Sequence, residues 1–527
     1  MTLADLFHDD SFDEVRDAVK GLYTPRRGLF LAVLTVVGFC LLINSSWRST
    51  PDSALYLELG ESLARGQGFV FNNEPHTFVP PGYPALVAVA ATIMGEGFLT
   101  YRILMALMGL LTAGAGYLLV RRLCGPDVGL LAGGLFAVNH VLLLNSTFTA
   151  SDVPFALSTL VALNAVLSAA GPRHRVLWLV AAGLLAGLPA LVRVNGWGVA
   201  PAAAIFLMCS RTDEPVSRRA LRVAAFLAIS VVPGALWAMH KTSYPTSFNE
   251  GTWLGAISGR GLDTQVSILL RAVWEYVPET SYALSGASIK TGLFEFIIPA
   301  LVLAGFVAAA RRRERLLVPL TVIQYCGLLL SPAGSRYLIM LVPGLYLFLA
   351  LGLIRFSQWV TPVIGGFGAS LVRRDRIVVY CFALLALLNV GANVVTVFQA
   401  RNAIQPGGAE SQRDLPFFTA AHWLRRHAPD GVVMTMHPRV IHYLSGLPSV
   451  ELIRSGFPEH DAWVRDPELI RKLVLSKKPD FFFSDANDSK LLAGVSKALE
   501  SLNLSLEEVT EARSSQRFAL WKISAKE

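Results

Sequence analysis

Long apolar segments alternate along this sequence with short clusters of arginine and histidine. The clusters lie at Arg26-Arg27, Arg121-Arg122, Arg173-His174-Arg175, Arg211 to Arg222, Arg311 to Arg315, and Arg355 to Arg376. Charged residues make up 16% of the chain, against about 25% in soluble globular proteins. This pattern is typical of a polytopic membrane protein whose cytoplasmic loops carry the positive charge.

If every basic cluster is cytoplasmic, the interval between two clusters must contain an even number of membrane crossings. Residues 28–120 contain three apolar segments, 28–44, 82–94 and 99–120, so one of them does not cross. The segment from Gly82 to Met94 would form a helix of roughly 20 Å, shorter than the bilayer core of roughly 30 Å. We therefore predict that it is a re-entrant or juxtamembrane helix on the outer side.

The other intervals each predict paired spans, with one final span leading outward. These spans are 127–145 and 153–170, 176–192 and 196–210, 223–239 and 292–310, 316–331 and 338–354, and lastly 377–397. The predicted fold is a polytopic α-helical membrane protein with about 11 transmembrane helices. Its amino terminus would lie inside and its carboxyl terminus outside, with a long outer loop at 240–290.

Three regions follow from this division. Residues 1–27 lack a cleavable signal pattern and are expected to be cytoplasmic. Residues 28–398 form the transmembrane domain, whose first outer loop is 45–99, and residues 399–527 are expected to form an extracytoplasmic α/β domain. In that domain 431–436, 480–484 and 518–522 are predicted as strands, and 414–427, 466–477 and 488–502 as helices.

Composition excludes several classes of function. The formal net charge of +8 comes largely from the basic clusters between apolar segments, as the positive-inside rule predicts, so we do not expect a nucleic-acid partner. The five cysteines are scattered and none lies in the carboxyl-terminal domain. Their spacing matches no metal site and allows no disulfide framework there. We predict neither a metal nor a cofactor.

The first outer loop opens with a helix-start pattern. Thr50 can cap the helix, Pro51 suits its first position, and Asp52 falls in the first turn. Leu55, Tyr56, Leu59 and Leu63 then recur at helical spacing, and Gly66 is a suitable end. This places the Asp52 carboxylate at the start of an amphipathic helix on the membrane surface, where the helix dipole favours its ionised form. Asp52 would then be a base or an electrostatic stabiliser, or it would be a helix-terminal residue with no role in catalysis.

The predicted topology brings further polar residues to the same outer surface. They are Glu74, His76, Asp152, Arg193, Asn195, His240, Lys241, Arg336 and Tyr337. Ionisable residues at membrane depth are costly and often functional. Each also has an ordinary explanation: Asp152 can cap a helix, Arg193 and Arg336 can reach to the interface, and His240 can end a span. Together, they suit a lipid-borne anionic substrate, because arginines bind phosphate and a carboxylate can deprotonate a hydroxyl.

An ordered set of motifs between residues 28 and 355 resembles those of the integral-membrane GT-C glycosyltransferases. The most similar branch contains the protein O-mannosyltransferases and the lipid A aminoarabinose transferases. The motifs are Asp52-x-x-x-Tyr56, Gly66-Gln67-Gly68-Phe69, Val79-Pro80-Pro81-Gly82-Tyr83-Pro84, Tyr101-Arg102, Arg121-Arg122, Ser151-Asp152-Val153-Pro154-Phe155, Leu191-Val192-Arg193, and Ser335-Arg336-Tyr337 with Pro343.

This resemblance implies an enzyme that takes a sugar from a polyprenyl phosphate and inverts the anomeric carbon. The acceptor would be an extracytoplasmic glycan, lipid or protein, reached from the outer face of a membrane, here expected to be a bacterial inner membrane. The resemblance makes Asp52 the base and places Asp152 in the same site, with Arg193 and Arg336 as candidates for the lipid phosphate. The expected substrate-binding set is Tyr56, Glu74, His76, Tyr83, Arg193, His240, Lys241, Arg336 and Tyr337.

The sequence departs from the family at two places in the first loop. Ser53 follows Asp52 where the mannosyltransferases have glutamate, and Val79-Pro80-Pro81 replaces the Glu-Lys-Pro of the aminoarabinose transferases. The acidic metal ligand of that motif is therefore missing, and Glu74 or His76 could replace it only through favourable geometry. The alternatives to an enzyme are a lipid or glycan transporter or flippase, and a non-catalytic scaffold with the GT-C shell.

Overall fold

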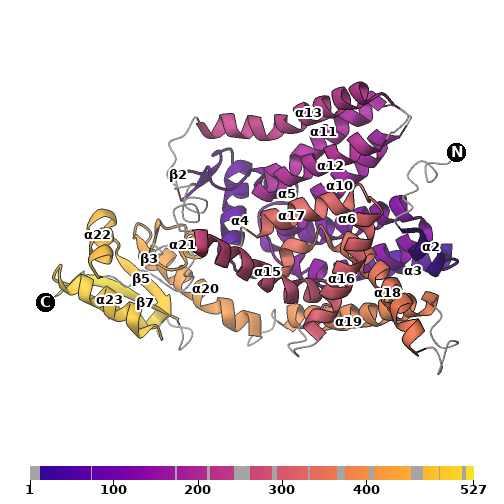
Figure 1. Ribbon diagram of the computed structural model, residues 1–527. Coiled ribbons are helices and arrows are strands. Elements are labelled where there is room, and N and C mark those ends of the chain that lie inside the picture. The colour runs from indigo at the N-terminus through magenta and orange to yellow at the C-terminus, as the bar shows by residue number, and fades with distance from the viewer. Residues whose placement is uncertain are drawn as a thin grey trace.

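The computed structural model describes residues 12–72, 74–171, 175–210, 214–242, 262–287, 294–329, 333–364, 374–402, 409–452, 467–485, 487–512 and 518–526. A large helical body occupies most of the molecule, and a smaller part that contains a sheet lies at the carboxyl-terminal end (Figure 1). The amino-terminal helices lie at the far end of the helical body from this sheet.

The first half of the helical body contains short and long helices. They are α2 (Asp13–Ala18), α3 (Pro25–Cys40), α4 (Pro51–Ala64), α5 (Gly82–Met94), α6 (Phe98–Cys124), α7 (Pro126–Val128), the π-helix η2 (Gly129–Gly133), α8 (Gly134–Ala137), α9 (His140–Asn145) and α10 (Asp152–Ala170). A two-stranded hairpin, β1 (Val70–Phe71) and β2 (Glu74–Pro75), lies between α4 and α5. The helix predicted for 82–94 is confirmed as α5.

The second half continues with α11 (Arg175–Val192), the 3-10 helix η3 (Val194–Gly198), α12 (Val199–Cys209), α13 (Val216–Thr242), α15 (Leu262–Ser285), α16 (Phe294–Arg311), α17 (Leu317–Leu328), the 3-10 helix η4 (Ser335–Leu338), α18 (Val342–Ile364) and α19 (Arg374–Asn402). Five of the described helices have segments long and apolar enough to cross a membrane: Phe98–Cys124, Asp152–Ala170, Val216–Thr242, Val342–Val360 and Arg376–Arg401. The total number of crossings and their direction remain predictions.

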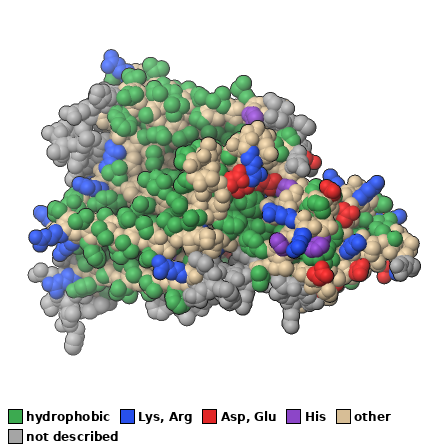
Figure 2. Space-filling model, turned by 180° about the vertical axis from the view of Figure 1, so that it is seen from behind, with side chains coloured by type: hydrophobic (Ala, Val, Ile, Leu, Met, Phe, Trp, Pro, Cys, Tyr) green, Lys and Arg blue, Asp and Glu red, His purple; other side chains and the backbone are tan. Residues whose placement is uncertain are grey.

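Described residues of two basic clusters, Arg312 and Arg355, meet at the amino-terminal helix α2. Glu14 of α2 forms ion pairs with Arg312, at the end of α16, and with Arg355 of α18. Arg16 donates to the carbonyl oxygen of Cys124, at the end of α6, over 3.0 Å. Figure 2 shows Lys and Arg side chains at the corresponding left edge of a broad apolar surface. This grouping agrees with the premise that the clusters share one side of the membrane.

Two segments differ from the predicted spans. Residues 262–285, inside the predicted outer loop, form the helix α15. The predicted span 127–145 is broken after Ala137, and Asn139 caps the new helix α9 by accepting a hydrogen bond from the Leu142 amide. The His140 amide donates to the side chain of Asn389 in α19 over 2.7 Å. Buried side-chain amides therefore satisfy the backbone groups that the break exposes.

The carboxyl-terminal part contains a five-stranded sheet in the order β4-β3-β5-β7-β6. Its strands are β3 (Val433–Thr435), β4 (Ser449–Glu451), β5 (Phe481–Asp485), β6 (Leu504–Glu508) and β7 (Phe518–Ala525), and its helices are α20 (Ala409–His427), α21 (Pro438–Ser445), α22 (Pro467–Lys477), α23 (Ser489–Glu500) and the 3-10 helix η5 (Thr510–Ala512). β3 runs parallel to β4 and β5, whereas β7 is antiparallel to β5 and β6. The predicted strands at 431–436, 480–484 and 518–522 and the predicted helices at 414–427, 466–477 and 488–502 are thus confirmed within a few residues.

The alternation of side chains along β5 divides the core of this part into two. Phe481 and Phe483 belong to the large apolar cluster that also contains Phe417 of α20. Phe482 points to the other face, into a separate cluster with Leu491 of α23. Because successive residues of a strand face opposite sides, both faces of the sheet are covered, and the face toward α20 and α21 is the one that is continuous with the helical body.

Candidate active site

The helix α4 carries Asp52 in its first turn, and the local sequence fixes this start. The Ser53 amide donates to Thr50 Oγ1 over 3.0 Å, and the Thr50 amide donates to Ser53 Oγ over 2.9 Å. This reciprocal capping box satisfies two amides that a helix start leaves open. Thr50 is the predicted cap, and the side chain of Asp52 is 54% exposed. The carboxylate is therefore accessible to a ligand.

Close helix packing places Tyr56 and Tyr83 beside each other behind Asp52. A Cβ atom at Gly60 of α4 would lie 2.4 Å from Val87 Cγ1, so glycine permits the contact between α4 and α5. The rings of Tyr56 and Tyr83 meet edge to face with centroids 5.1 Å apart, and both are buried. Burial raises the pKa of Tyr56 above its ordinary value, and the negative charge of Asp52 adds to this effect. Tyr56 is therefore a neutral hydroxyl near the carboxylate.

Asp152 and Arg193 form a buried ion pair next to Tyr56. Asp152 lies in the first turn of α10, is 5% exposed, and accepts a hydrogen bond of 2.9 Å from Arg193 Nη1. The same nitrogen donates to Ser151 Oγ over 3.0 Å, and the Tyr56 hydroxyl lies 3.0 Å from that oxygen. Three segments distant in the sequence thus meet through Ser151. Its role is not apparent from the sequence, because a serine at a helix start is common.

The second arginine lies beside the same cluster. The guanidinium groups of Arg193 and Arg336 lie 4.9 and 4.8 Å from the centroid of the Tyr337 ring. Arg336 also donates to the Tyr337 hydroxyl over 2.8 Å, and its side chain is exposed. Arg193 is thus held by a carboxylate, whereas Arg336 is held by an aromatic residue and faces the surface.

The hairpin and α13 contribute further polar residues that the sequence predicted for the site. His76 accepts a hydrogen bond of 3.3 Å from the Val79 amide at Nε2. Burial, and the positive charges of Arg439 and Lys241, lower the pKa of His76 to about 4, so the ring is neutral near pH 7. Lys241 and its neighbour His240 end α13, and His240 stacks on Trp237 with centroids 5.4 Å apart.

Glu74 is an exposed residue of the hairpin. It lies in the short strand β2, where it pairs through its backbone with Phe71. Among the described residues, no group of three His, Cys, Asp or Glu side chains comes together as a metal site would require. The structure therefore gives no geometry by which Glu74 or His76 would replace a metal ligand.

Arg439 of α21 is the residue near Asp52 that the sequence did not reveal. Its Nη1 lies 3.1 Å from Asp52 Oδ1, although the two residues are 387 positions apart. The local sequence around Arg439 carries no motif, and only the docking of α21 on α4 brings it to this position. The candidate active site therefore has a contribution from the carboxyl-terminal part.

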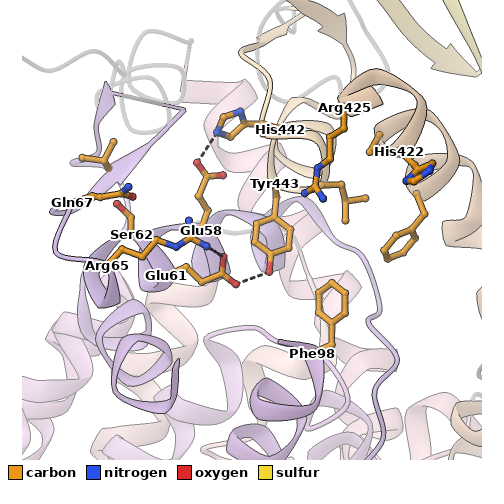
Figure 3. Close-up of a pocket in the computed structure, with 15 residues that line it drawn as sticks. Glu58, Glu61, Ser62, Arg65, Gln67, Phe98, His422, Arg425, His442 and Tyr443 are labelled. Carbon is orange, nitrogen blue, oxygen red and sulfur yellow. Dashed lines mark hydrogen bonds and ion pairs between the residues drawn. The ribbon is translucent and has the colours of Figure 1, made fainter. Parts of the chain in front are cut away.

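A separate cavity of about 570 Å³ lies on the other face of α4 (Figure 3). Since an α-helix turns about 100° per residue, Glu58, Glu61 and Arg65 point away from Asp52. Glu58 Oε1 lies 2.6 Å from His442 Nε2, and Glu61 Oε1 accepts hydrogen bonds from Tyr443 and Tyr101 over 2.8 and 2.6 Å. His442 is thus a buried partner of Glu58.

Comparison with known proteins shows what this chain is similar to. Residues 78–237 match the family model described as dolichyl-phosphate-mannose-protein mannosyltransferase. An uncharacterized protein of Aquifex aeolicus (strain VF5) is 26% identical over 131 residues, which are 24% of this chain and 26% of that protein. The chain thus spans about a quarter of the length of this curated relative.

Solved structures match almost the whole chain. ArnT from Cupriavidus metallidurans in the apo state has 15% identity and a TM-score of 0.56, covering 94% of this chain and 98% of ArnT. The same protein bound to undecaprenyl phosphate has a TM-score of 0.60 at 15% identity, with 94% and 97% covered. The archaeal oligosaccharyltransferase AglB from Archaeoglobus fulgidus, in complex with an inhibitory peptide and a dolichol-phosphate, gives 0.53 at 14% identity, with 87% of this chain and 69% of AglB covered.

The solved structures show that the chain has the GT-C fold, and residues 78–237 also resemble a mannosyltransferase family. The resemblance predicted from the motifs is confirmed, and the chain is an integral membrane protein with the fold of the GT-C glycosyltransferases. Tyr83 and Arg193 of the candidate site fall within the matched residues 78–237, whereas Asp52 precedes them.

Proposed function

We propose that this protein transfers a sugar from a polyprenyl-phosphate donor to an acceptor outside the cytoplasm, with Asp52 as the general base. The observation that carries the proposal is the position of Asp52. Its exposed carboxylate lies on the face of α4 that also carries Tyr56, beside the buried pair of Asp152 and Arg193. The fold supports it too, because similar structures were solved with undecaprenyl phosphate and with dolichol-phosphate.

The proposed reaction is a single displacement at the anomeric carbon. Asp52 accepts the proton of an acceptor hydroxyl, and the acceptor oxygen attacks the anomeric carbon on the face opposite the phosphate. The bond between that carbon and the phosphate oxygen breaks, its electron pair leaves with the polyprenyl phosphate, and the configuration inverts. The acceptor is a glycan, lipid or protein. Such an attack needs the base and the leaving group on opposite sides of the sugar.

The arginines have different tasks in this proposal. Arg336 is exposed, so it can turn from Tyr337 toward the lipid phosphate and neutralise the charge that develops as the bond breaks. Arg193 is fixed by Asp152 and Ser151. Asp152 is thus a positioning residue that keeps Arg193 in place, and the rings of Tyr56 and Tyr83 form the apolar wall behind the sugar.

The site would face the outside of the membrane, in a bacterium the periplasmic side of the inner membrane. This orientation follows from the basic clusters, two of which have described residues that meet at α2. The candidate site lies elsewhere, where α4 meets α21 of the carboxyl-terminal part. The lipid tail of the donor would extend into the surrounding bilayer, so membrane lipids are natural partners of the site.

The test uses the protein in nanodiscs with a panel of polyprenyl-phosphate sugars. Mass spectrometry measures release of free polyprenyl phosphate by the wild type and by Asp52→Asn, and we expect the variant to lose at least 100-fold in rate, as removal of a general base does. Equal rates would keep the enzyme but refute Asp52 as its base. If no donor is consumed with any acceptor preparation, the transporter or scaffold alternatives are favoured over the enzyme.

A further inference from the structure

The ion pair between Asp52 and Arg439 joins the proposed base to the carboxyl-terminal part. Arg439 Nη1 lies 3.1 Å from Asp52 Oδ1, and the two side chains are 22% and 54% exposed. The carboxylate is thus covered on one side by a guanidinium and open on the other. A base whose oxygen is already occupied by a cation has fewer lone pairs for an acceptor hydroxyl.

Several contacts of the carboxyl-terminal part fix the position of Arg439. α21 lies along α4, and one turn beyond Arg439 its residues His442 and Tyr443 bond to Glu58 and Glu61 (Figure 3). Nearby, Asn72 and the backbone of Ser449 exchange two hydrogen bonds, of 3.2 and 3.3 Å. Arg439 therefore reaches Asp52 because the whole helix is docked. To bind a phosphate on the opposite side of the sugar, its long side chain must adopt a different rotamer that swings the guanidinium away from Asp52, which does not require α21 to undock.

Arg439 has a second cation, Lys241, in its neighbourhood. Arg439 and Lys241 both act on His76, which places the two cations near the same ring. Arg193 is already held by Asp152 and Ser151. Arg439 is paired with the carboxylate that the reaction needs, so its partner, like that of Arg336, would change during the reaction.

We propose that Arg439 is a phosphate-binding residue that exchanges Asp52 for the lipid phosphate when the donor enters. The exchange would free the Asp52 oxygen for the acceptor hydroxyl and place a bidentate donor on the leaving group. It would also make the base available only when the donor is bound. This inference rests on the proposed function and assigns the carboxyl-terminal part a direct role in donor binding.

Binding of undecaprenyl phosphate, without any turnover, tests the exchange. Wild type, Arg439→Gln and Arg439→Lys are compared in nanodiscs by native mass spectrometry. We expect Arg439→Gln to weaken binding about 10- to 100-fold, the effect of one charged hydrogen bond, and Arg439→Lys to weaken it less. The matched control is His442→Gln, which removes another contact between α21 and α4, the one with Glu58, and leaves Asp52 and Arg439 in place; it should change the affinity less than twofold.

If Asp52 and the lipid phosphate compete for Arg439, a change at Asp52 should alter the affinity for undecaprenyl phosphate. Asp52→Asn should bind undecaprenyl phosphate more tightly than wild type, because Arg439 is released from its partner. This gain should disappear in the Arg439→Gln background, so the double-mutant cycle should show coupling. A gain of equal size in both backgrounds would mean simple repulsion by Asp52 and would overturn the exchange.

Two other results would also overturn the inference. Unchanged affinity in Arg439→Gln would remove Arg439 from phosphate binding. Equal losses in Arg439→Gln and His442→Gln would show that only the docking of α21 matters. Failure of the proposed function gives different results. A wild type that binds no undecaprenyl phosphate would refute the donor class. If the wild type binds it with the predicted coupling but Asp52→Asn still turns over, only the role of Asp52 as base is refuted.

Discussion

Replacing either member of the Asp152–Arg193 pair should lower the free energy of unfolding. Replacing both should lower it by less than the sum of the two single losses. The charged atoms lie 2.9 Å apart, with side chains 5% and 24% exposed. At an effective dielectric constant of about 20, two unit charges at this distance attract by about 6 kcal/mol, much of which offsets their desolvation. The net stabilisation by the pair is therefore small, and the largest loss of stability is expected when one charge stays buried without its partner.

The two single variants should lose different amounts of stability. Arg193→Gln leaves the Asp152 carboxylate buried without a cation, for which we expect a loss of about 3–4 kcal/mol in the free energy of unfolding. Asp152→Asn keeps the shape and one acceptor oxygen, and the unpaired arginine is partly exposed, so about 2 kcal/mol is expected. The double variant has a neutral pair that can still hydrogen-bond, and its loss should be smaller than the sum by about 2 kcal/mol.

The free energy of unfolding can be measured by titrating SDS into mixed micelles and following tryptophan fluorescence. Turnover of the same variants gives the functional half of the test. Asp152→Asn should lower kcat/KM for the donor about 100-fold, since displacing Arg193 by about 1 Å is enough for such a loss. Additive losses of stability, or a stable and fully active Asp152→Asn, would refute the argument and return Asp152 to the role of a helix-capping residue.

Two further predictions concern α4 and its neighbours. Burial of the His442 ring opposes its protonation, but the hydrogen bond to Glu58 outweighs this and raises the pKa of His442. The docking of α21 is therefore stabilised fully below the unfolded pKa of about 6.5 and weakens as pH rises through the higher folded pKa. Hydrogen exchange in α21 should follow this trend, and His442→Gln should abolish it. Gly60→Ala would put a Cβ 2.4 Å from Val87 Cγ1, so we expect a loss of about 1–3 kcal/mol and reduced turnover, whereas Gly327→Ala, with nothing within 4 Å of its Cβ, should be neutral in thermal unfolding assays.

The features that the sequence predicted well are helix ends, which are set by residues close together in the chain. A helix from Gly82 to Met94 follows from Pro80-Pro81 and Gly95, and α5 has these bounds. Thr50 and Ser53 are neighbours in the chain, so the start of α4 was also predictable. The meeting of Asp152 with Arg193 was expected only as a shared surface, and the structure adds the bond between them.

Other features depend on contacts that no local pattern encodes. The break after Ala137 was missed because Asn139 and His140 interrupt an otherwise apolar segment only briefly. The partner of the His140 amide is the distant Asn389. α15 lies inside the predicted outer loop 240–290, and the sequence did not indicate this helix, since Arg271, Glu275 and Glu279 interrupt its apolar character. Arg439 could not be assigned to the site at all, since its contact with Asp52 spans 387 positions.

The same separation has a consequence for how the protein is made. Asp52 leaves the ribosome 387 residues before Arg439, which at roughly 5–20 residues per second is a delay of about 20–80 s. During this time α4 lacks the helix that covers it, with Glu58 and Glu61 still without His442 and Tyr443. The site is therefore completed late in biosynthesis, and a partly translated chain in the membrane holds the aspartate without the arginine that pairs with it.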